Sequence, residues 1–221
     1  MGDPAQWPLL TALPESVRDE VLRTMRRRTY ARGEVLFHAG DPGDTLHLVA
    51  EGRVAIRIST ELGDTATLSV LGPGESFGEL ALLNPGSVRT ATAVALDDTA
   101  TWTLHRNQFE MLRASAPTVD RFLSELLATR VQRLTSLLIE ALYVPAEQRV
   151  ARRVRDLAEA YGGVHTGTVV RCTQDDIASL AGVSRPTANL VLGELAQAGA
   201  LILGRGRIEV RDPAALARRA R

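Results

Sequence analysis

Hydrophobic and polar positions alternate in different ways along the chain. In residues 7–28 the apolar residues recur three and four positions apart, which predicts a helical segment in which Pro14 can start a helix and residues 26–28 form a basic end. From residue 30 to about 104, short apolar runs at 35–37, 45–49, 54–58, 65–70 and 91–96 are separated by turn residues. Strands at such regular spacing are typical of a small β-roll or barrel.

The pattern becomes helical again in residues 119–143, which contain no Gly or Pro. One apolar stripe steps by four and three positions, as in a coiled-coil seam, through Leu127, Val131, Leu134, Leu138 and Ala141. A second stripe, Phe122, Leu123 and Leu126, can pack on the β-roll. The seam could instead be core within one chain. Because the helix is too long for the small roll to cover both stripes, the sequence favours a homodimer.

Pro145 ends this helix and starts another over about 146–161, which Gly162 and Gly163 terminate. Residues 173–195 then fit a helix-turn-helix. Thr173 caps the first helix in a capping box with Asp176, Gly182 allows the tight turn, and Ser184 caps the second helix. The predicted shared core is Ile177, Ala181, Ala188, Val191 and Leu195. An ordinary αα-hairpin is the alternative. Because the two caps, the turn glycine and the apolar core positions all fit the helix-turn-helix pattern, the sequence favours DNA binding.

The second helix of this motif would enter the major groove with its N-terminus first. Arg185 is the best candidate for a base contact, because a guanidinium can pair with O6 and N7 of guanine. Thr187 and Asn189 are the other polar side chains near that end. Residues 201–210 predict a hairpin wing whose tip carries Arg205, placed to meet a phosphate or simply to lie on the surface. Thr173 and Ser184 are included among the DNA-binding residues.

Composition and charge fit this organisation. The 221 residues suffice for two small domains, and 45% hydrophobic residues provide their cores. The net charge is zero, but from residue 144 onward 12 Arg stand against 8 acidic residues, the asymmetry expected of a DNA-binding half. The single cysteine, Cys172, excludes an internal disulfide and an iron–sulfur cluster. Neither a signal peptide nor a membrane span is recognisable, so we expect a cytoplasmic protein.

Residues 77–93 carry the sharpest chemical signal. A one-turn helix beginning at Gly78 would point free N–H groups at an anion, and Arg89 and Thr90 would add a charge and a hydroxyl. Glu79 is out of place beside a phosphate unless it accepts a hydrogen bond from a ligand hydroxyl. A 3′,5′-cyclic nucleotide has a phosphate next to a free ribose 2′-OH. The alternative is an ion pair between Glu79 and Arg89 across a turn.

These motifs resemble the catabolite activator (cyclic AMP receptor) branch of the bacterial Crp/Fnr-type transcription regulators. The resemblance covers nearly the entire chain, including residues 40–46, 51–54, the phosphate-binding cassette, the long helix and the winged helix-turn-helix. It implies that Glu79 binds the ribose 2′-OH, and that Arg89 and Thr90, with the backbone at Gly78 and Leu80, hold the cyclic phosphate. It also implies that Thr135 reaches the adenine.

The chain departs from the family at three positions. Leu134 stands where a second hydroxyl residue is common, Pro186 where an acidic residue reads cytosine, and Leu190 where a second Arg reads the DNA. Arg185 remains. We therefore expect a palindrome that keeps a guanine for Arg185, with Leu190 packing on a thymine methyl group. Alternatively, Arg185 holds a phosphate and Leu190 belongs to the core.

The sequence thus predicts an α+β protein with a cyclic-nucleotide-binding β-roll domain (residues 1–116), a dimerisation helix and hinge (117–144) and a winged helix-turn-helix domain (145–221). Its expected effector is cyclic AMP, without a metal; its expected partners are double-stranded DNA, a second copy and RNA polymerase. Cyclic GMP, another ligand or a silent cassette are the alternatives. An enzyme or channel is disfavoured, since the four His form no cluster and are interpreted as surface or turn residues, and neutral charge disfavours an architectural DNA protein.

Overall fold

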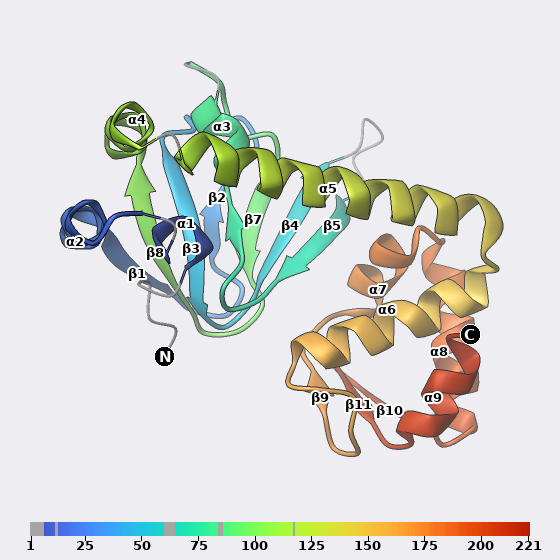
Figure 1. Ribbon diagram of the computed structural model, residues 1–221. Coiled ribbons are helices and arrows are strands. Elements are labelled where there is room, and N and C mark those ends of the chain that lie inside the picture. Colours follow the sequence, from blue (N-terminus) through green and yellow to red (C-terminus); the bar gives the residue numbers. More distant parts are fainter. Residues whose placement is uncertain (1–6, 12, 60–64, 84–85, 117) are drawn as a thin grey trace. The chain divides into compact units, whose positions relative to one another are not determined.

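The computed structural model describes residues 7–11, 13–59, 65–83, 86–116 and 118–221. The chain forms two compact units, one of Met1–Thr65 with Ser69–Gln132 and one of Ala66–Leu68 with Arg133–Arg221 (Figure 1). The division falls within the long helix α5 (Thr118–Tyr143), so each unit holds a part of it.

The first unit is a β-roll of two four-stranded sheets. One sheet has the order β1 (Arg26–Tyr30), β8 (Thr99–His105), β3 (Thr45–Glu51), β6 (Ser76–Phe77). The other has the order β2 (Val35–Phe37), β7 (Thr92–Ala95), β4 (Val54–Ser59), β5 (Thr65–Leu71), of which Ala66–Leu68 are assigned to the second unit. The predicted roll is confirmed, and five of its strands fall on the predicted segments. Strands β1, β6 and β8 were not predicted.

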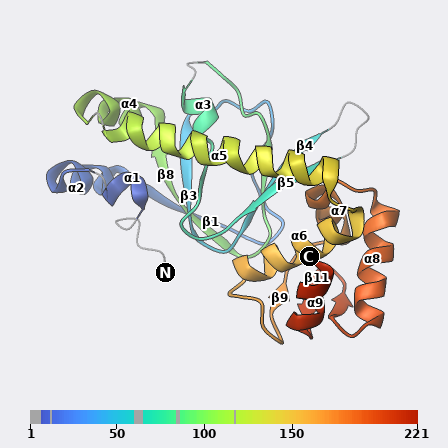
Figure 2. The same ribbon diagram turned by 45° about the vertical axis from the view of Figure 1, so that its right-hand side comes forward.

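Four helices accompany the roll: α1 (Pro8–Thr11), α2 (Glu15–Thr24), the short α3 (Glu79–Leu83) and α4 (Arg106–Ser115). In both views α1, α2 and α4 lie together beside β1 and β8 (Figures 1 and 2). The first part of α5 joins them through Val119 and Leu123. Of the predicted stripe, Leu123 therefore packs on the roll, and Leu126 is half-buried. The side chain of Phe122 lies outside the described residues.

Strand β3 is buried on both sides because it separates two cores. Leu46 and Leu48 belong to the core that the helices cover, whereas Val49 belongs to the core between the two sheets. Since side chains alternate along a strand, Thr45 and His47 share the inner side with Val49. Both are buried. This placement brings polar side chains into the interior of the roll.

One expectation for the N-terminal segment was wrong. Residues 26–28 are not the basic end of a helix; they lie in the edge strand β1, where Arg26, Arg27 and Arg28 pair with Thr103, Trp102 and Thr101 of β8. Helix α2 ends at Thr24. Residues 26–28 form a strand because their backbone pairs with the distant strand β8. The spacing of apolar residues within one segment cannot reveal such a partner.

The second unit consists of helices around a small sheet. Helices α6 (Ala146–Ala160), α7 (Gln174–Ala181), α8 (Arg185–Gln197) and α9 (Pro213–Arg219) surround strands β9 (Val169–Val170), β10 (Leu201–Gly204) and β11 (Arg207–Val210) (Figure 1). The hairpin of β10 and β11 is the predicted wing, and β9, which ends two residues before Cys172, adds a third strand. The five residues expected as the shared helix-turn-helix core are all buried.

Candidate functional site

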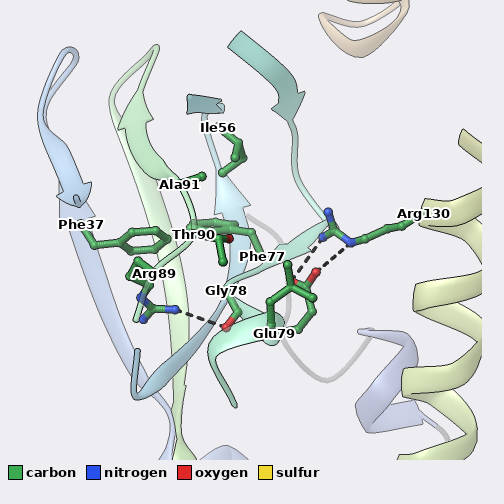
Figure 3. Close-up of a pocket in the computed structure, with 10 residues that line it drawn as sticks. Phe37, Ile56, Phe77, Gly78, Glu79, Arg89, Thr90, Ala91 and Arg130 are labelled. Atoms are coloured by element: carbon green, nitrogen blue, oxygen red, sulfur yellow. Dashed lines mark hydrogen bonds and ion pairs between the residues drawn. The ribbon is translucent and has the colours of Figure 1, made fainter. Parts of the chain in front are cut away.

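A pocket in the first unit collects the residues of the predicted phosphate-binding cassette (Figure 3). They come from both sheets, from the turn between β6 and α3, from the start of α3, from the segment before β7, and from α5. The lining residues are Phe37, Ile56, Phe77, Gly78, Glu79, Leu80, Arg89, Thr90, Ala91 and Arg130. Figure 3 shows Arg89 and Phe37 on one side of the pocket and the pair of Glu79 and Arg130 on the other.

The guanidinium of Arg89 is the buried cation of the pocket, with only 4% of the residue exposed. Its Nη2 donates to Thr45 Oγ1 over 2.7 Å and its Nη1 to the Gly78 carbonyl over 3.2 Å. Its Cζ lies 4.1 Å from the centroid of the Phe37 ring, a cation–π contact. Its Nε is buried without a hydrogen-bond acceptor, and no carboxylate in the described part of the chain forms an ion pair with it. Such a site favours an anion.

Neighbouring charges act on this group in both directions. Burial lowers the pKa of Arg89 from its ordinary value, and Arg106 adds to this effect, whereas Asp44, Asp41 and Glu79 raise it. A guanidinium stays protonated in proteins, so the net result is a buried positive charge whose compensation comes from carboxylates that it does not touch. A phosphate oxygen would supply direct compensation.

Gly78 is needed for the position of Arg89. Its φ of +88° lies in the left-handed region, and a Cβ there would stand 2.6 Å from Arg89 Nη1 and 2.9 Å from the Thr45 carbonyl oxygen. Helix α3 begins at the next residue, which is within one position of the predicted start. A side chain at position 78 would therefore displace the guanidinium as well as strain the turn.

Glu79 is buried and pairs with Arg130 of α5, not with Arg89. Nε of Arg130 lies 2.9 Å from Glu79 Oε1, while its Nη2 donates to the Ser76 carbonyl over 2.7 Å and lies 3.4 Å from Glu79 Oε2 (Figure 3). The alternative of an ion pair between Glu79 and Arg89 is thus not what the structure contains. Sequence reasoning missed Arg130, because its 51-residue separation from Glu79 leaves no local signal.

The other predicted ligand residues differ in their surroundings. Thr90 is exposed and lines the pocket, as does Leu80, which is 47% exposed. Thr135 is exposed on the part of α5 that belongs to the second unit. Its predicted contact with adenine therefore remains a prediction.

His47 does not fit the expectation that the histidines lie on the surface or in turns. It is 4% exposed, and its ring stacks on Phe77 with centroids 4.9 Å apart and an interplanar angle of 16°. The expectation failed because His47 occupies an inward position of β3, the strand that is buried on both sides. The other three, His38, His105 and His165, are exposed.

The helix-turn-helix has the predicted local geometry. The Thr173 side chain accepts from the Asp176 amide, and Asp176 accepts in return from the Thr173 backbone, which forms the capping box. Gly182 has a φ of +61° at the turn. Ser184 caps α8 by accepting from the Thr187 amide over 3.4 Å. These contacts fix where each helix begins.

The start of α8 presents its polar side chains to solvent. The side chain of Arg185 is 67% exposed, and its Nε lies 3.0 Å from Asp175 Oδ1. Asn189 is exposed and Thr187 is half-buried. Leu190 is 65% exposed, which excludes the alternative that it belongs to the core of this unit. At the tip of the wing, Arg205 is exposed between β10 and β11.

An arginine that the sequence did not single out ties the helix-turn-helix turn to the end of α5. Nη1 of Arg149 donates to the carbonyls of Ala141 and Val144, and its Nη2 donates to that of Gly182. Glu140 pairs in addition with Arg152 and Arg153 of α6. Charged side chains therefore stabilise the junction at Pro145, where the backbone alone could bend.

The predicted dimer seam is largely exposed. Val131, Leu134 and Leu138 are 60–65% exposed, while Leu127, closer to the roll, is half-buried. Ile139, Leu142 and Tyr143 extend the exposed apolar surface to the end of α5. Contiguous exposed apolar surface on a helix is typical of an interaction site.

Other kinds of site find no support in the described residues. They contain no group of His, Cys, Asp and Glu arranged to hold a metal ion. None of the described helices combines the length and the apolar character that a membrane crossing requires. Cys172 is buried between β9 and α7, and burial together with Asp176 raises the pKa of its thiol to about 12. It is therefore an unreactive thiol.

A pocket with a buried guanidinium and carboxylate, followed by a winged helix-turn-helix, defines a regulator that binds a small anionic ligand and DNA. The family model of the cyclic nucleotide-binding domain matches residues 27–116, and that of the Crp-like helix-turn-helix domain matches residues 148–219. The chain belongs to the Crp/Fnr family of cyclic nucleotide-binding, DNA-binding transcription regulators. Members of this family are not enzymes.

The sequences of individual relatives align with most of this chain. The "Cyclic AMP receptor protein" of Thermus thermophilus is 37% identical over 209 residues, which span 95% of this chain and 94% of that protein. The "CRP-like cAMP-activated global transcriptional regulator" of Mycobacterium tuberculosis is 32% identical over 87% of each chain. The crystal structure of Thermus thermophilus catabolite activator protein matches 96% of this chain and 98% of its own, with 36% identity and a TM-score of 0.54.

Proposed function

We propose that cyclic AMP is the effector of this regulator. The observation that carries the proposal is the buried Arg89, which lacks a carboxylate partner among the described residues and lies in the same pocket as Glu79. A cyclic phosphate would compensate Arg89, and the ribose 2′-OH would donate to the Glu79 carboxylate. Two relatives that cover most of the chain carry cyclic AMP in their names, which supports the same ligand here.

Calorimetric titration of the purified protein with cyclic AMP and, separately, with cyclic GMP tests the effector. We expect saturable binding of one ligand per chain, with cyclic AMP bound more tightly. The two ligands share the ribose and cyclic phosphate, so Glu79, Arg89 and Thr90 would hold both, and the preference must come from base contacts such as that proposed for Thr135. Tighter binding of cyclic GMP would make cyclic GMP the effector in place of cyclic AMP. If neither nucleotide binds, the proposal of a cyclic nucleotide effector is refuted.

The protein is further proposed to act as a homodimer through α5. The support is the exposed apolar seam of Val131, Leu134 and Leu138, which continues to Leu142 and Tyr143. In water such a stripe is stabilised when a second copy covers it. Two copies related by a twofold axis would place two recognition helices α8 on successive major grooves, so the DNA site would be palindromic.

Leu134→Asp tests the dimer, because it buries a charge in the proposed seam. Light scattering at micromolar concentration should report a dimer for the wild type and a monomer for the variant, and the variant should bind its DNA site far more weakly. Ser136→Asp, at an exposed position two residues away, is a matched control that should remain dimeric. A monomeric wild type would refute the homodimer.

As a ligand-dependent transcription regulator, the protein would act where the chromosome is, in the cytoplasm. We also propose RNA polymerase as a partner, since a regulator bound beside a promoter alters transcription by contact with the polymerase or by occlusion. Co-sedimentation of the DNA complex with RNA polymerase, with and without cyclic AMP, tests this contact.

A further inference from the structure

A chain of buried polar side chains runs from Arg89 into the interior of the roll. Arg89 Nη2 donates to Thr45 Oγ1 over 2.7 Å, and Thr45 Oγ1 lies 3.3 Å from Nε2 of His47. His47 Nδ1 in turn lies 3.3 Å from Thr101 Oγ1. Thr45, His47 and Thr101 are 9%, 4% and 0% exposed. Neither the cassette motif nor the pocket lining includes any of these three residues.

The direction of hydrogen bonding along this chain follows from its first member. A guanidinium can only donate, so Thr45 must accept from Arg89. The hydroxyl hydrogen of Thr45 is then free to be donated to Nε2 of His47. A neutral imidazole that accepts at Nε2 carries its hydrogen on Nδ1, which donates to Thr101. Each donor from Arg89 through Thr45 to His47 thus meets an acceptor, and bonds aligned in one direction strengthen one another.

The aromatic rings hold this chain in place. His47 stacks on Phe77, its centroid lies 5.6 Å from that of Phe37, and Phe37 in turn lies against the guanidinium of Arg89. Thr45 and His47 are two residues apart on β3 and so share one side of the sheet. Thr101 comes from the neighbouring strand β8, two residues from the position that pairs with His47. Backbone pairing and ring packing therefore fix all members.

The charge of His47 fits this arrangement. Burial, followed by repulsion from Arg89 and Arg28, lowers the pKa of His47 to about 3. The ring is therefore neutral at any ordinary pH and can accept from Thr45. A protonated ring would donate at both nitrogens and would leave the Thr45 hydrogen without its acceptor.

We propose that Thr45 and His47 are positioning residues that hold the Arg89 guanidinium in the orientation that receives the cyclic phosphate. An unrestrained arginine loses rotamer freedom when it binds a phosphate, whereas a guanidinium held in advance does not, so the chain raises affinity without touching the ligand. This inference rests on the proposed function, namely that Arg89 binds the phosphate of cyclic AMP. It adds to the binding site two residues, Thr45 and His47, that are not expected to touch the ligand.

The test combines cyclic AMP titrations of full-length variants with nitrogen NMR of the ligand-free protein. Thr45→Val keeps the shape of the side chain but removes the hydroxyl, and should weaken binding by about tenfold, as expected for one charge-assisted hydrogen bond. Thr45→Ser should restore the affinity. His47→Phe, which keeps the stacked ring, should weaken binding less than Thr45→Val because Thr45 can still accept from Arg89.

A control variant and a double variant distinguish loss of the Arg89 orientation from a general disturbance of the fold. Thr103→Val removes another buried hydroxyl from β8, one that donates to the Arg26 carbonyl, and should leave the affinity unchanged. In an Arg89→Leu background, Thr45→Val should cause no further loss, since the group that it positions is absent. Equal losses in the two backgrounds, or wild-type affinity in Thr45→Val, would overturn the proposal.

The NMR spectrum tests the chain without any ligand. Imidazole nitrogen shifts distinguish the two neutral tautomers, and we expect His47 to carry its hydrogen on Nδ1. Hydrogen on Nε2 would make His47 the donor to Thr45, leave the Thr45 hydroxyl hydrogen without this acceptor, and overturn the proposal even if cyclic AMP binds. If the wild type binds neither cyclic AMP nor cyclic GMP, the proposed effector fails, while the tautomer still decides whether the chain from Arg89 exists as described.

Discussion

The ligand pocket and the DNA-recognition helix place their arginines in opposite environments. Arg89 is 4% exposed and is held by Thr45, the Gly78 carbonyl and the ring of Phe37. The side chain of Arg185 is 67% exposed and touches one carboxylate, that of Asp175. The two guanidiniums are chemically the same, so the difference lies in what surrounds them.

The contrast shows two ways to recognise an anionic ligand. In the pocket, folding has already buried the cation and fixed its direction, so a phosphate would gain a strong interaction at a small cost in ordering. On α8, the exposed arginine would keep most of its hydration until DNA binds, and as proposed it would then pair with a base edge. The buried site should therefore be sensitive to small changes, whereas the exposed site should change specificity more than total affinity.

The largest expected effect comes from removing the buried cation. Arg89→Leu should cost about 2–5 kcal/mol of cyclic AMP binding, because the phosphate would then enter a buried site without its charge partner. Calorimetric titration measures the loss. Arg185→Ala is the matched control, an arginine removed from the exposed site, and should bind cyclic AMP like the wild type. Equal affinities of wild type and Arg89→Leu would show that this pocket is not the phosphate site.

A smaller effect is expected from the exposed arginine. Arg185→Ala should cost about 1–3 kcal/mol of discrimination at one guanine of the DNA site, the value of a bidentate pair with O6 and N7. Binding-site selection with both proteins measures it, and neighbouring positions should be permissive because Leu190, which is exposed, can offer only apolar contact. Uniform weakening with an unchanged motif would make Arg185 a phosphate anchor instead.

The smallest effect concerns the buried histidine beside Arg89. The pKa of His47 is lowered to about 3, while in the unfolded chain it returns to about 6.5. Between these values the unfolded chain takes up a proton that the folded protein does not, so the free energy of unfolding falls as the pH falls below about 6.5. The slope for one such group approaches about 1.4 kcal/mol per pH unit.

Urea unfolding at pH 7, 6 and 5 measures this slope. His47→Phe cannot bind the proton and should lose less stability than the wild type over the same range. The exposed His165→Phe is the control and should follow the wild type. Parallel curves for wild type and His47→Phe would mean that His47 is not held neutral by burial.

The helix-turn-helix could be predicted from the sequence almost residue by residue. Its signals act between positions at most a few residues apart: Thr173 with Asp176 three positions on, Gly182 at the turn, and Ser184 with Thr187. Such contacts form within one turn of chain, so the residue types alone suffice to indicate them. The bounds and the partner of the third strand β9 could not be predicted, because it is two residues long and is defined by its distant partner β11.

The pocket could be predicted in part. Residues 77–93 form a local motif, and the structure places Gly78, Glu79, Arg89 and Thr90 along one pocket as expected. The partners of Glu79 and Arg89 were not predicted. Arg130 of α5 pairs with Glu79, and Thr45 of β3 accepts a hydrogen bond from Arg89. Both contacts cross more than forty residues of chain.

The sequence by itself therefore determined the succession of β-roll, long helix and winged helix-turn-helix, the two kinds of recognition site, and Glu79 and Arg89 as the charged residues of the cassette, because hydrophobic period, capping and turn chemistry act locally. Only the tertiary structure decided which strands pair, that β3 is buried on both sides, that His47 is an interior residue and that Arg130 faces Glu79. These depend on the joint packing of segments far apart in the chain, for which no single segment contains the information.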